Sequence, residues 1–534
     1  MTELELKLAS AAKLAGRGKV SRRDFMQVAL AAGMTAAAAN AMFVKAVRAE
    51  PKRGGTLKIG LAHGATTDSL DPGLYYDQYT GTACWGTLSN SLTEVDPKGD
   101  AVPDLAESFE PSDGAKKWVF KVRKGVTFHN GKTVTADDVV ASIKHHSIEG
   151  TKSAAKSLLA PVKNVRADGP ETVIFELDGG NADFPYIVSD YHIPIMPKKD
   201  DGSADWSSGI RTGPYVLEKF EPGVTANFHK NANYYKSDRG WFDRVECLSI
   251  KDVTARTNAL TSGETHYLHR ADLPTLDLLK QNPNVLILET TGYGHYIYVM
   301  NVTAAPFDNV DVRTAIKYSL NRDDIVKKVF LGHGVVGNDN PIAPTVKFAV
   351  DPQPRHVYDP DKAKSLLRKA GMETLKFDLS VAEAAFTGAT DSAILWKEHA
   401  KAAGIDLNVI REPEDAYWDN VWLKKPFVAS YWAGRPTCDW MFTTAYAADA
   451  AWNDTFWKNP RFNELLLQAR AETDDNKRAG MYAEMQQLVH DDGGLVNLVF
   501  NSFVDAHSNA LAHGEVASNW PIDGMKIAER WWFA

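Results

Sequence analysis

Residues Pro103 to Lys144 read PDLAESFEPSDGAKKWVFKVRKGVTFHNGKTVTADDVVASIK, and this stretch carries the densest set of local structural signals in the chain. It predicts a short helix, a turn at Asp113-Gly114, a strand over 118–122 and, after tight connections, a second helix. Thr135 is the predicted N-cap of that second helix, with acidic residues in its first turn. The stretch therefore predicts a small α/β unit.

The chain has 534 residues, of which 44% are hydrophobic and 24% charged. This length exceeds the size at which a single core keeps growing, so two or three domains are expected. Apolar residues alternate along 54–60, 292–301 and 495–506, as in strands with one buried face. The last two strands could cross between domains.

The N-terminal segment has the features of an export signal. Arg22-Arg23 precedes an Ala-rich apolar run that reaches Val44, and Val47-Arg48-Ala49 places small residues at the −3 and −1 positions of a cleavage site. This pattern resembles a twin-arginine signal, which predicts export to the periplasm by the twin-arginine machinery and cleavage near Ala49. No cysteine lies near that position, so a lipid anchor is not expected.

Charge and cysteine content narrow the class of protein. Removing residues 1–49, with a net charge of +5, from a chain of net charge −8 leaves about −13. This balance argues against nucleic acid or an anionic membrane as the main partner. Cys84, Cys247 and Cys438 permit at most one intramolecular disulfide, and the sequence does not select the pair.

Segments that match enzyme or metal-binding motifs lack the neighbouring residues that such sites require. Residues 332–337 match GxGxxG, but Asn338 to Pro341 cannot open the helix that a dinucleotide site requires. His266 and His269 lack a third ligand of suitable spacing, and His145-His146 is expected at the surface. No HExxH, GxSxG or phosphate-loop motif is present. The sequence predicts no catalytic residue, no cofactor and no metal.

A family resemblance rests on several motifs in one order along the chain. The opening stretch resembles LAESW…W.F.LRKGVKFHDG.P.TAEDV, a signature of the extracytoplasmic solute-binding proteins of peptide, nickel and oligosaccharide ABC importers, of the dipeptide- and oligopeptide-binding type. Further motifs of that family resemble RTGPYVL at 211–217, TSGE at 261–264, PFDNVDVRTAI at 306–316 with NRDDI at 321–325, and YDPDKA at 358–363.

The resemblance implies an α/β fold of two lobes with a ligand cleft between them and a third domain inserted in the first lobe. The expected boundaries are a signal peptide at 1–49, lobe I at 50–95, 206–298 and 500–534, an inserted domain at 96–205, and lobe II at 299–499. The implied function is a monomeric, non-enzymatic receptor that closes around a small peptide or similar polar solute and delivers it to a membrane permease. An exported enzyme, a subunit of a signalling receptor and a receptor for a sugar, opine-like or metal-chelate ligand are the alternatives.

The segment 428–457 is the candidate ligand site, because eight of its 30 residues are aromatic in a chain that averages 10%. Peptide-binding relatives place Trp-x-x-Asp here, and its carboxylate pairs with the ligand's ammonium group. In this chain Trp432 is followed at that position by Arg435, and Asp439 comes four residues later. Either Asp439 takes the ammonium, or the ligand presents an anionic or polyhydroxy end to Arg435.

Rings and carboxyl groups complete the prediction. Aromatic faces beside a few fixed charges suit a small polar ligand, although the same residues also build ordinary cores. The remaining candidate ligand contacts are Trp432, Trp440, Tyr296, Tyr298, Trp452, Asp454, Tyr75 and Asp68.

Overall fold

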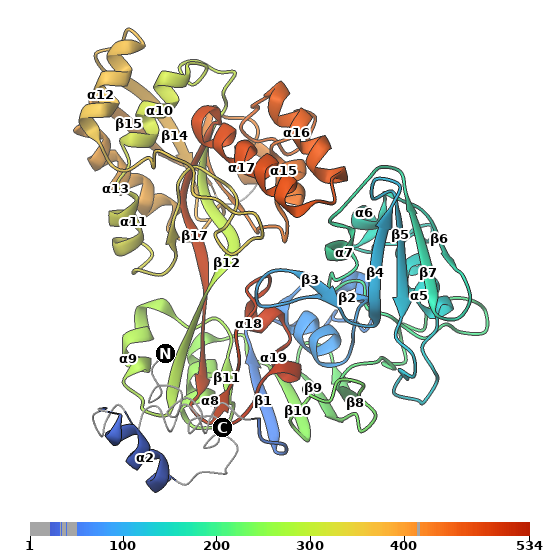
Figure 1. The fold of residues 1–534 in the computed structure, drawn as a ribbon. Coiled ribbons are helices and arrows are strands. Elements are labelled where there is room, and N and C mark those ends of the chain that lie inside the picture. Colours follow the sequence, from blue (N-terminus) through green and yellow to red (C-terminus); the bar gives the residue numbers. More distant parts are fainter. Residues whose placement is uncertain (1–21, 33, 35–38, 40–50, 414–416) are drawn as a thin grey trace.

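The computed structural model describes residues 22–32, 34, 39, 51–413 and 417–534. They form an upper and a lower α/β lobe and a third domain beside them (Figure 1). Helix α2 (Arg22–Ala31) lies within the predicted export signal. The predicted cleavage site near Ala49 lies outside the described residues.

The lower lobe is built around strand β1 (Thr56–Leu61), whose apolar side chains are fully buried. β10 (Arg244–Ser249) and β11 (Tyr267–Leu268) flank β1 in parallel, and β9 (Thr225–Lys230) and β8 (Tyr215–Glu221) continue the sheet in antiparallel fashion. The other elements of this lobe are η1 (Pro72–Leu74), α4 (Gln78–Thr80), η2 (Gly81–Thr87), α8 (Val253–Thr261), η3 (Leu273–Thr275), α9 (Leu276–Lys280), α18 (Pro521–Gly524), α19 (Ile527–Arg530), and the paired strands β18 (Leu511–Ala512) and β19 (Trp532–Phe533).

Two long strands belong to both lobes. β12 (Val285–Met300) and β17 (Leu495–Ser508) pair antiparallel and run from one lobe into the other (Figure 1). Their register shifts between Thr291 and His295, where the pair leaves the lower lobe. β17 includes the predicted strand 495–506, and β12 covers the predicted strand 292–301 up to Met300 and begins seven residues before it.

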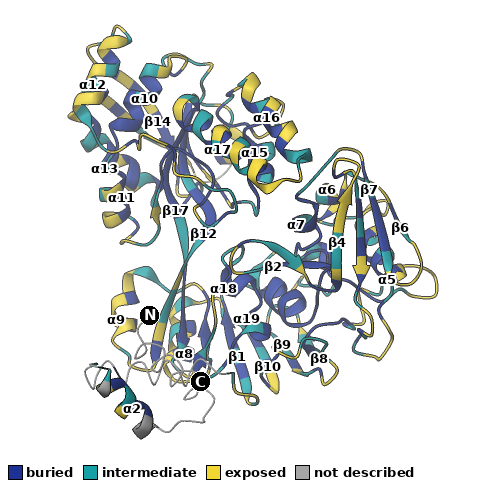
Figure 2. Cartoon of the chain, in the orientation of Figure 1, coloured by how far each residue is buried: buried dark blue, intermediate teal, exposed yellow. Residues whose placement is uncertain are grey.

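In the upper lobe, β16 (Phe427–Trp432) pairs antiparallel with β12, and β14 (Leu375–Val381) and β15 (Ile405–Arg411) extend the sheet in parallel with β16. β13 (Val335–Val336) pairs with β17. Its helices are α10 (Val310–Tyr318), α11 (Arg322–Lys328), α12 (Pro360–Lys369), α13 (Ala389–Lys401), α14 (Tyr417–Asn420), α15 (Cys438–Ala445), α16 (Pro460–Ala471) and α17 (Asp475–Asp492). They enclose the buried strands and turn their exposed faces outward (Figure 2).

The third domain contains the sheet β4-β5-β7-β6, formed by β4 (Ala106–Ser112), β5 (Lys117–Val122), β7 (Thr172–Leu177) and β6 (Val162–Ala167). The helix α5 (Ala136–His145) begins at the predicted N-cap, where Thr135 and Asp138 form a capping box. The short helix predicted before Asp113 is wrong, because residues 106–112 pair with β5 as a strand. The remaining elements are β2 (Thr93–Val95), β3 (Ala101–Pro103), α6 (Lys156–Leu159) and α7 (Phe184–Ile187).

Two sequence expectations concern buried polar side chains. His146, predicted at the surface, is buried, and its Nδ1 lies 2.7 Å from the Ser153 hydroxyl; His145 lies 2.8 Å from the Asp71 carboxylate. All three cysteines are buried and free.

None of the described helices combines the length and apolar character that crossing a lipid bilayer requires.

Candidate functional site

Strand directions place the carboxyl ends of both parallel sheets between the lobes. β12 rises from the lower to the upper lobe, and β17 returns antiparallel to it. β11 is antiparallel to β17, so β11, β1 and β10 also run toward the upper lobe. β16 is antiparallel to β12, so β16, β14 and β15 run toward the lower lobe. Ligands of open α/β sheets bind outside the carboxyl ends of the strands, which makes the region between these two edges the candidate site.

Arg435 follows the carboxyl end of β16. Its Nη1 donates a hydrogen bond to the Gly434 carbonyl at 2.7 Å, and its guanidinium carbon lies 6.0 Å from the centroid of the Trp432 ring. Burial lowers the pKa of Arg435, and the carboxylate of Asp190 in the third domain opposes that shift from a distance. Asp190 is itself paired with His192 at 2.6 Å. Within the described chain Arg435 forms no ion pair, so it presents an un-neutralised cation to this region.

Asp439 has a different environment from Arg435. It lies in the first turn of α15, and its two carboxylate oxygens are 3.1 and 3.2 Å from Nε of Arg470 on α16. Burial raises the pKa of Asp439 to about 6, although Arg470 favours the charged form. The carboxylate is therefore engaged inside the upper lobe, and Arg435 and Asp439 do not pair with each other.

Five aromatic rings form a cluster on the upper lobe. Trp432 lies 6.1 Å from Trp452 and 6.5 Å from Trp422, and Trp418 lies 5.7 Å from Tyr431 and 5.8 Å from Trp422. Trp452 is 50% exposed, whereas Trp432 is buried. The structure thus brings Trp432 and Trp452 together, with the guanidinium of Arg435 over the first ring.

A buried carboxyl group lies behind these rings. Asp454 Oδ2 accepts a hydrogen bond from Trp422 Nε1 at 3.1 Å and a longer one from Ser430 Oγ at 3.4 Å. Its Oδ1 has no hydrogen-bond partner among the described residues. Burial raises the pKa of Asp454 to about 7, so its protonation changes near neutral pH. The neighbouring loop lines an open hollow of about 250 Å³. Asp449, Asn453 and Lys458 are among the lining residues.

The other predicted contacts are dispersed. Tyr296 is partly buried and stacks on Phe386 at 4.7 Å, and Trp440 is partly buried on α15. Tyr298 and Tyr75 are fully buried; the Tyr298 hydroxyl bonds Ala389 O at 2.8 Å, and the Tyr75 hydroxyl bonds Leu70 O at 3.1 Å. These two side chains have no surface available to a ligand in this conformation.

Asp68 lies in the first loop of the lower lobe. Its Oδ2 accepts a hydrogen bond from the Ala65 amide at 2.8 Å, and burial raises the pKa of the Asp68 carboxyl. It lies apart from the aromatic cluster of the upper lobe, on the segment that follows β1. The predicted contacts are therefore distributed over both lobes.

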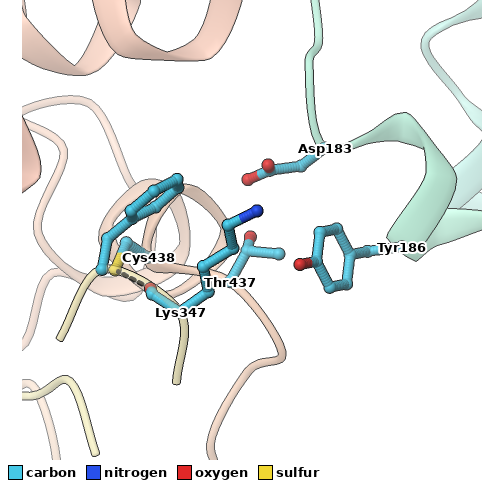
Figure 3. A pocket seen from close by; sticks show the side chains of 6 residues that line it. Asp183, Tyr186, Lys347, Thr437 and Cys438 are labelled. Carbon is cyan, nitrogen blue, oxygen red and sulfur yellow. Dashed lines mark hydrogen bonds between the residues drawn. The ribbon is translucent and has the colours of Figure 1, made fainter. Parts of the chain in front are cut away.

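The third domain also contacts the upper lobe near α15. Asp183 and Tyr186 at α7 face Lys347, Thr437 and Cys438 around a cavity of about 10 Å³, which has room for one water molecule (Figure 3). Lys347 bridges the two parts through Asp100 at 3.0 Å and Asp475 at 2.8 Å. This contact was not foreseen, because its residues in the third domain and its residues in the upper lobe are more than 150 positions apart in the sequence.

Sequence reasoning also missed Trp418, Trp422 and Arg470. Trp418 and Trp422 are four residues apart, a spacing that places side chains on the same face of a helix, and this was an available signal. Arg470 carried no such signal, since only the packing of α16 against α15 brings it to Asp439. The described residues contain no group of three or more His, Cys, Asp or Glu side chains arranged to hold a metal ion.

Two α/β lobes joined by a pair of crossing strands, with aromatic and charged side chains at the facing strand ends, define the class of solute-binding receptors. Residues 100–454 match the model of the bacterial extracellular solute-binding proteins, family 5 Middle. The chain belongs to this family, which consists of extracytoplasmic binding proteins and not of enzymes.

Two relatives and one solved structure align with this chain over most of their length. The chain is 25% identical to the di/tripeptide-binding protein 1 of Pseudomonas aeruginosa, an alignment that covers 79% of this chain and 84% of that protein. It is 26% identical to the dipeptide-binding protein of Escherichia coli, covering 83% and 93% respectively. The structure of HbpA2 from Haemophilus parasuis superposes with a TM-score of 0.80 at 21% identity, covering 87% of this chain and 98% of that one. The structural match supports the two-lobed fold.

Proposed function

We propose that this chain is an exported receptor of an ABC importer, which captures a small peptide or similar polar solute between its lobes and delivers it to a membrane permease. Names of relatives support the peptide class, since two of them are dipeptide- or di/tripeptide-binding proteins. The proposed divisions are lobe I at 50–95, 206–298 and 500–534, lobe II at 299–499, and the inserted domain at 96–205. The receptor acts as a monomer after the twin-arginine machinery has exported it and residues 1–49 have been removed.

Closure follows from the connection between the lobes. β12 and β17 run through the space between the lobes, and their register shift near Thr291 breaks the regular ladder where bending is needed. Rotation of one lobe toward the other brings the carboxyl ends of the two parallel sheets together and excludes water from the ligand. The closed form then docks on the permease, whose partner subunits hydrolyse ATP.

The observation that carries the ligand proposal is the cation of Arg435, which no described carboxylate neutralises. Desolvating a guanidinium without a partner is unfavourable, and an anionic ligand group removes that penalty. A hydrogen bond to a charged group contributes about 1.5–3 kcal/mol, enough for a tenfold or greater change in affinity. Arg435 therefore binds a carboxylate of the solute.

The neighbouring residues have supporting roles in this proposal. Trp432 and Trp452 provide apolar walls, and Asp454 sets the polarity behind them. Asp439 orients α15 through Arg470 and leaves the ligand anion to Arg435. Tyr296, Trp440 and Asp68 lie at the margins, while Tyr75 and Tyr298 support the walls from within the cores.

The test is to purify the exported protein from its native host, denature it and identify the released small molecule by mass spectrometry. We expect a carboxylate-bearing peptide or related polar compound. A ligand at 100 times its Kd raises the free energy of unfolding by about 2.7 kcal/mol, which a thermal shift detects. A shift with a metal chelate or haem and with no peptide, amino-acid derivative or sugar would refute the proposal.

A matched pair of variants locates the ligand anion. Arg435→Ala should weaken binding of the recovered solute at least tenfold, and Arg435→Lys should weaken it less because the charge remains. The same solute with its carboxylate amidated should bind wild type and Arg435→Ala with similar affinity. Equal affinity of Arg435→Ala and wild type for the acid would remove Arg435 from the site.

A further inference from the structure

A second guanidinium without an ion-pair partner among the described residues, and this one exposed, belongs to Arg270 at the carboxyl edge of the lower lobe. Arg270 is outside the set of residues selected from the sequence. Arg270 follows the end of β11, and His63 follows the end of the neighbouring strand β1. These strands are parallel, so both residues emerge toward the upper lobe. Gln78, the first residue of α4, lies on the other side of His63.

The backbone of Arg270 is held in a conformation that L-residues avoid. Its φ is +58°, in the left-handed region, which is unfavourable for any residue with a Cβ atom. Two contacts hold it there: the Arg270 amide donates to Asp505 Oδ1 at 2.7 Å, and the Arg270 carbonyl accepts from Arg256 Nη2 at 3.1 Å. Strain of this kind persists where the surrounding structure over-determines it and is concentrated at functional sites.

Both oxygens of the nearby Asp505 carboxylate already accept hydrogen bonds. Asp505 Oδ2 accepts a hydrogen bond from the Tyr267 hydroxyl at 2.5 Å, and its other oxygen takes the backbone amide of Arg270. The guanidinium of Arg270 instead faces an imidazole, with Nη1 3.2 Å from His63 Nε2. In the part of the chain that the structure describes, no carboxylate forms an ion pair with this guanidinium.

His63 cannot satisfy both of its neighbours. The Gln78 backbone amide faces His63 Nδ1 at 3.4 Å, and the Arg270 guanidinium faces Nε2. Burial and the charge of Arg270 lower the pKa of His63, so the ring is neutral at pH 7. A neutral imidazole accepts at one nitrogen only and carries a proton on the other. His63 can therefore accept a hydrogen bond from only one of these two groups, and among the described residues no other atom accepts from the Arg270 guanidinium.

The surroundings direct Arg270 toward the space between the lobes. Its positive charge acts on the Tyr296 phenol on β12. Burial raises the pKa of that phenol, and the charge of Arg270 opposes the rise. The preceding residue, His269, is buried and lies edge-on to His63 at 5.7 Å, and its Nδ1 has no hydrogen-bond partner in the described part of the chain. The site thus combines a fixed backbone, an exposed cation and polar groups with unmet hydrogen-bonding capacity.

We propose that Arg270 is the anchor in the lower lobe for an anionic group of the solute, with Asp505 and Arg256 fixing its backbone and His63 supporting its guanidinium. The proposal rests on the proposed function, since it takes the space between the lobes as the ligand site. It assigns the solute to the acidic class, carrying a carboxylate or an equivalent anion for the lower lobe to hold. A carboxylate offers two acceptors to the planar guanidinium and resolves the conflict at His63.

The central variant is Arg270→Gly. Glycine adopts a φ of +58° without a steric penalty, so this variant should unfold at a temperature equal to or above that of wild type. Arg270→Gln removes the charge and keeps a side chain. Arg461→Gln, on α16 of the upper lobe, makes the same change in net charge far from the site and serves as the control.

The first readout uses acetate, succinate and inorganic phosphate as probes, each compared with chloride at constant ionic strength. At least one of these anions should raise the melting temperature of wild type and Arg461→Gln, and the rise should be lost in Arg270→Gly and Arg270→Gln. Equal responses in all four proteins, including no response in any, would overturn the assignment.

The second readout separates this assignment from the receptor function. The solute recovered from the native host should bind Arg270→Gly at least tenfold more weakly than wild type. If that solute binds both proteins equally, the receptor function stands and the role of Arg270 is refuted. If the host protein releases no solute and none binds, the receptor function itself fails, and the anion titration still decides whether Arg270 holds an anion.

Discussion

The carboxylate of Asp183 in the third domain accepts a hydrogen bond from the guanidinium of Arg478 in the upper lobe, and both side chains are buried. Arg478 also lies over the Phe348 ring at 5.3 Å, and next to the pair the Ala182 amide donates to the Arg470 carbonyl at 2.8 Å. The third domain is therefore tied to the upper lobe, although the two are far apart in the sequence. This tie fixes one side of the space between the lobes.

Asp183→Asn should destabilise the protein. Removing one member of a buried ion pair leaves the other charge without compensation, a loss of about 3 kcal/mol or more in the free energy of unfolding. Urea unfolding at pH 7 measures it. Asp200→Asn, at an exposed position in the same domain, makes the same chemical change and should alter stability by less than about 0.5 kcal/mol. Equal small effects of both substitutions would show that the pair does not hold the domains together.

The titration of Asp454 should lower the free energy of unfolding as the pH rises. Its pKa is about 7 in the folded protein, because of burial, against an ordinary value of 3.8. Between these values the folded state binds more protons than the unfolded state, so the free energy of unfolding decreases from pH 4 to pH 7. The difference corresponds to about 4 kcal/mol at 1.36 kcal/mol per pKa unit.

Asp454→Asn isolates this contribution from other buried acids. The amide oxygen can still accept from Trp422 Nε1, and no charge forms at any pH. We expect the stability of Asp454→Asn relative to wild type to increase steadily between pH 4 and pH 7 in urea unfolding experiments. A difference that stays constant across this range would mean that Asp454 titrates normally.

Local signals in the sequence predicted the parts of the fold that local interactions decide. The capping box at Thr135 and Asp138 depends on residues three apart, and the alternating pattern along β12 and β17 reports burial directly. Residues 106–112 were misassigned because their strand conformation depends on pairing with β5. His146 was placed at the surface for a similar reason, since the segment that covers it lies outside its helix.

The residue types at the candidate site could be predicted from the sequence, but the contacts between their side chains could not. The density of rings in 428–457 indicated three rings of the aromatic cluster, Tyr431, Trp432 and Trp452, but not Trp418 and Trp422. For Arg435 and Asp439 the sequence left open whether they pair with each other or contact a ligand. The structure pairs Asp439 with Arg470, 31 residues away along the chain, and not with Arg435. Arg270 gave no sequence signal at all, because its left-handed backbone and its contact with His63 exist only in the folded chain.

Gly434→Ala should disturb the junction between β16 and the crossing strands. A Cβ atom at Gly434 would lie 2.3 Å from the Tyr293 carbonyl carbon, and φ is +81°. Gly371→Ala is the matched control, since φ is +79° there but no atom lies within 4 Å of the added Cβ. Both variants bear the conformational penalty of about 1–2 kcal/mol, and Gly434→Ala should lose about 1–3 kcal/mol more through the clash. Equal losses in urea unfolding would show that the contact with Tyr293 relaxes freely.

Trp452 should report the arrival of a ligand. Its side chain is half exposed and lies 6.1 Å from Trp432, whose ring is already buried. Closure of the lobes around a solute removes water from the exposed indole, so tryptophan emission should shift to shorter wavelength when the recovered solute is added. Trp452→Phe should lose most of that shift and keep an aromatic wall, whereas Trp452→Ala should also weaken binding about fivefold or more, because a ring buried at a binding interface contributes strongly to affinity. Trp206→Phe, at another partly exposed tryptophan in the segment before β8, should leave both the shift and the affinity unchanged. A full spectral shift in Trp452→Phe, with unaltered affinity in Trp452→Ala, would place the ligand away from the aromatic cluster and leave Arg435 without its neighbouring wall.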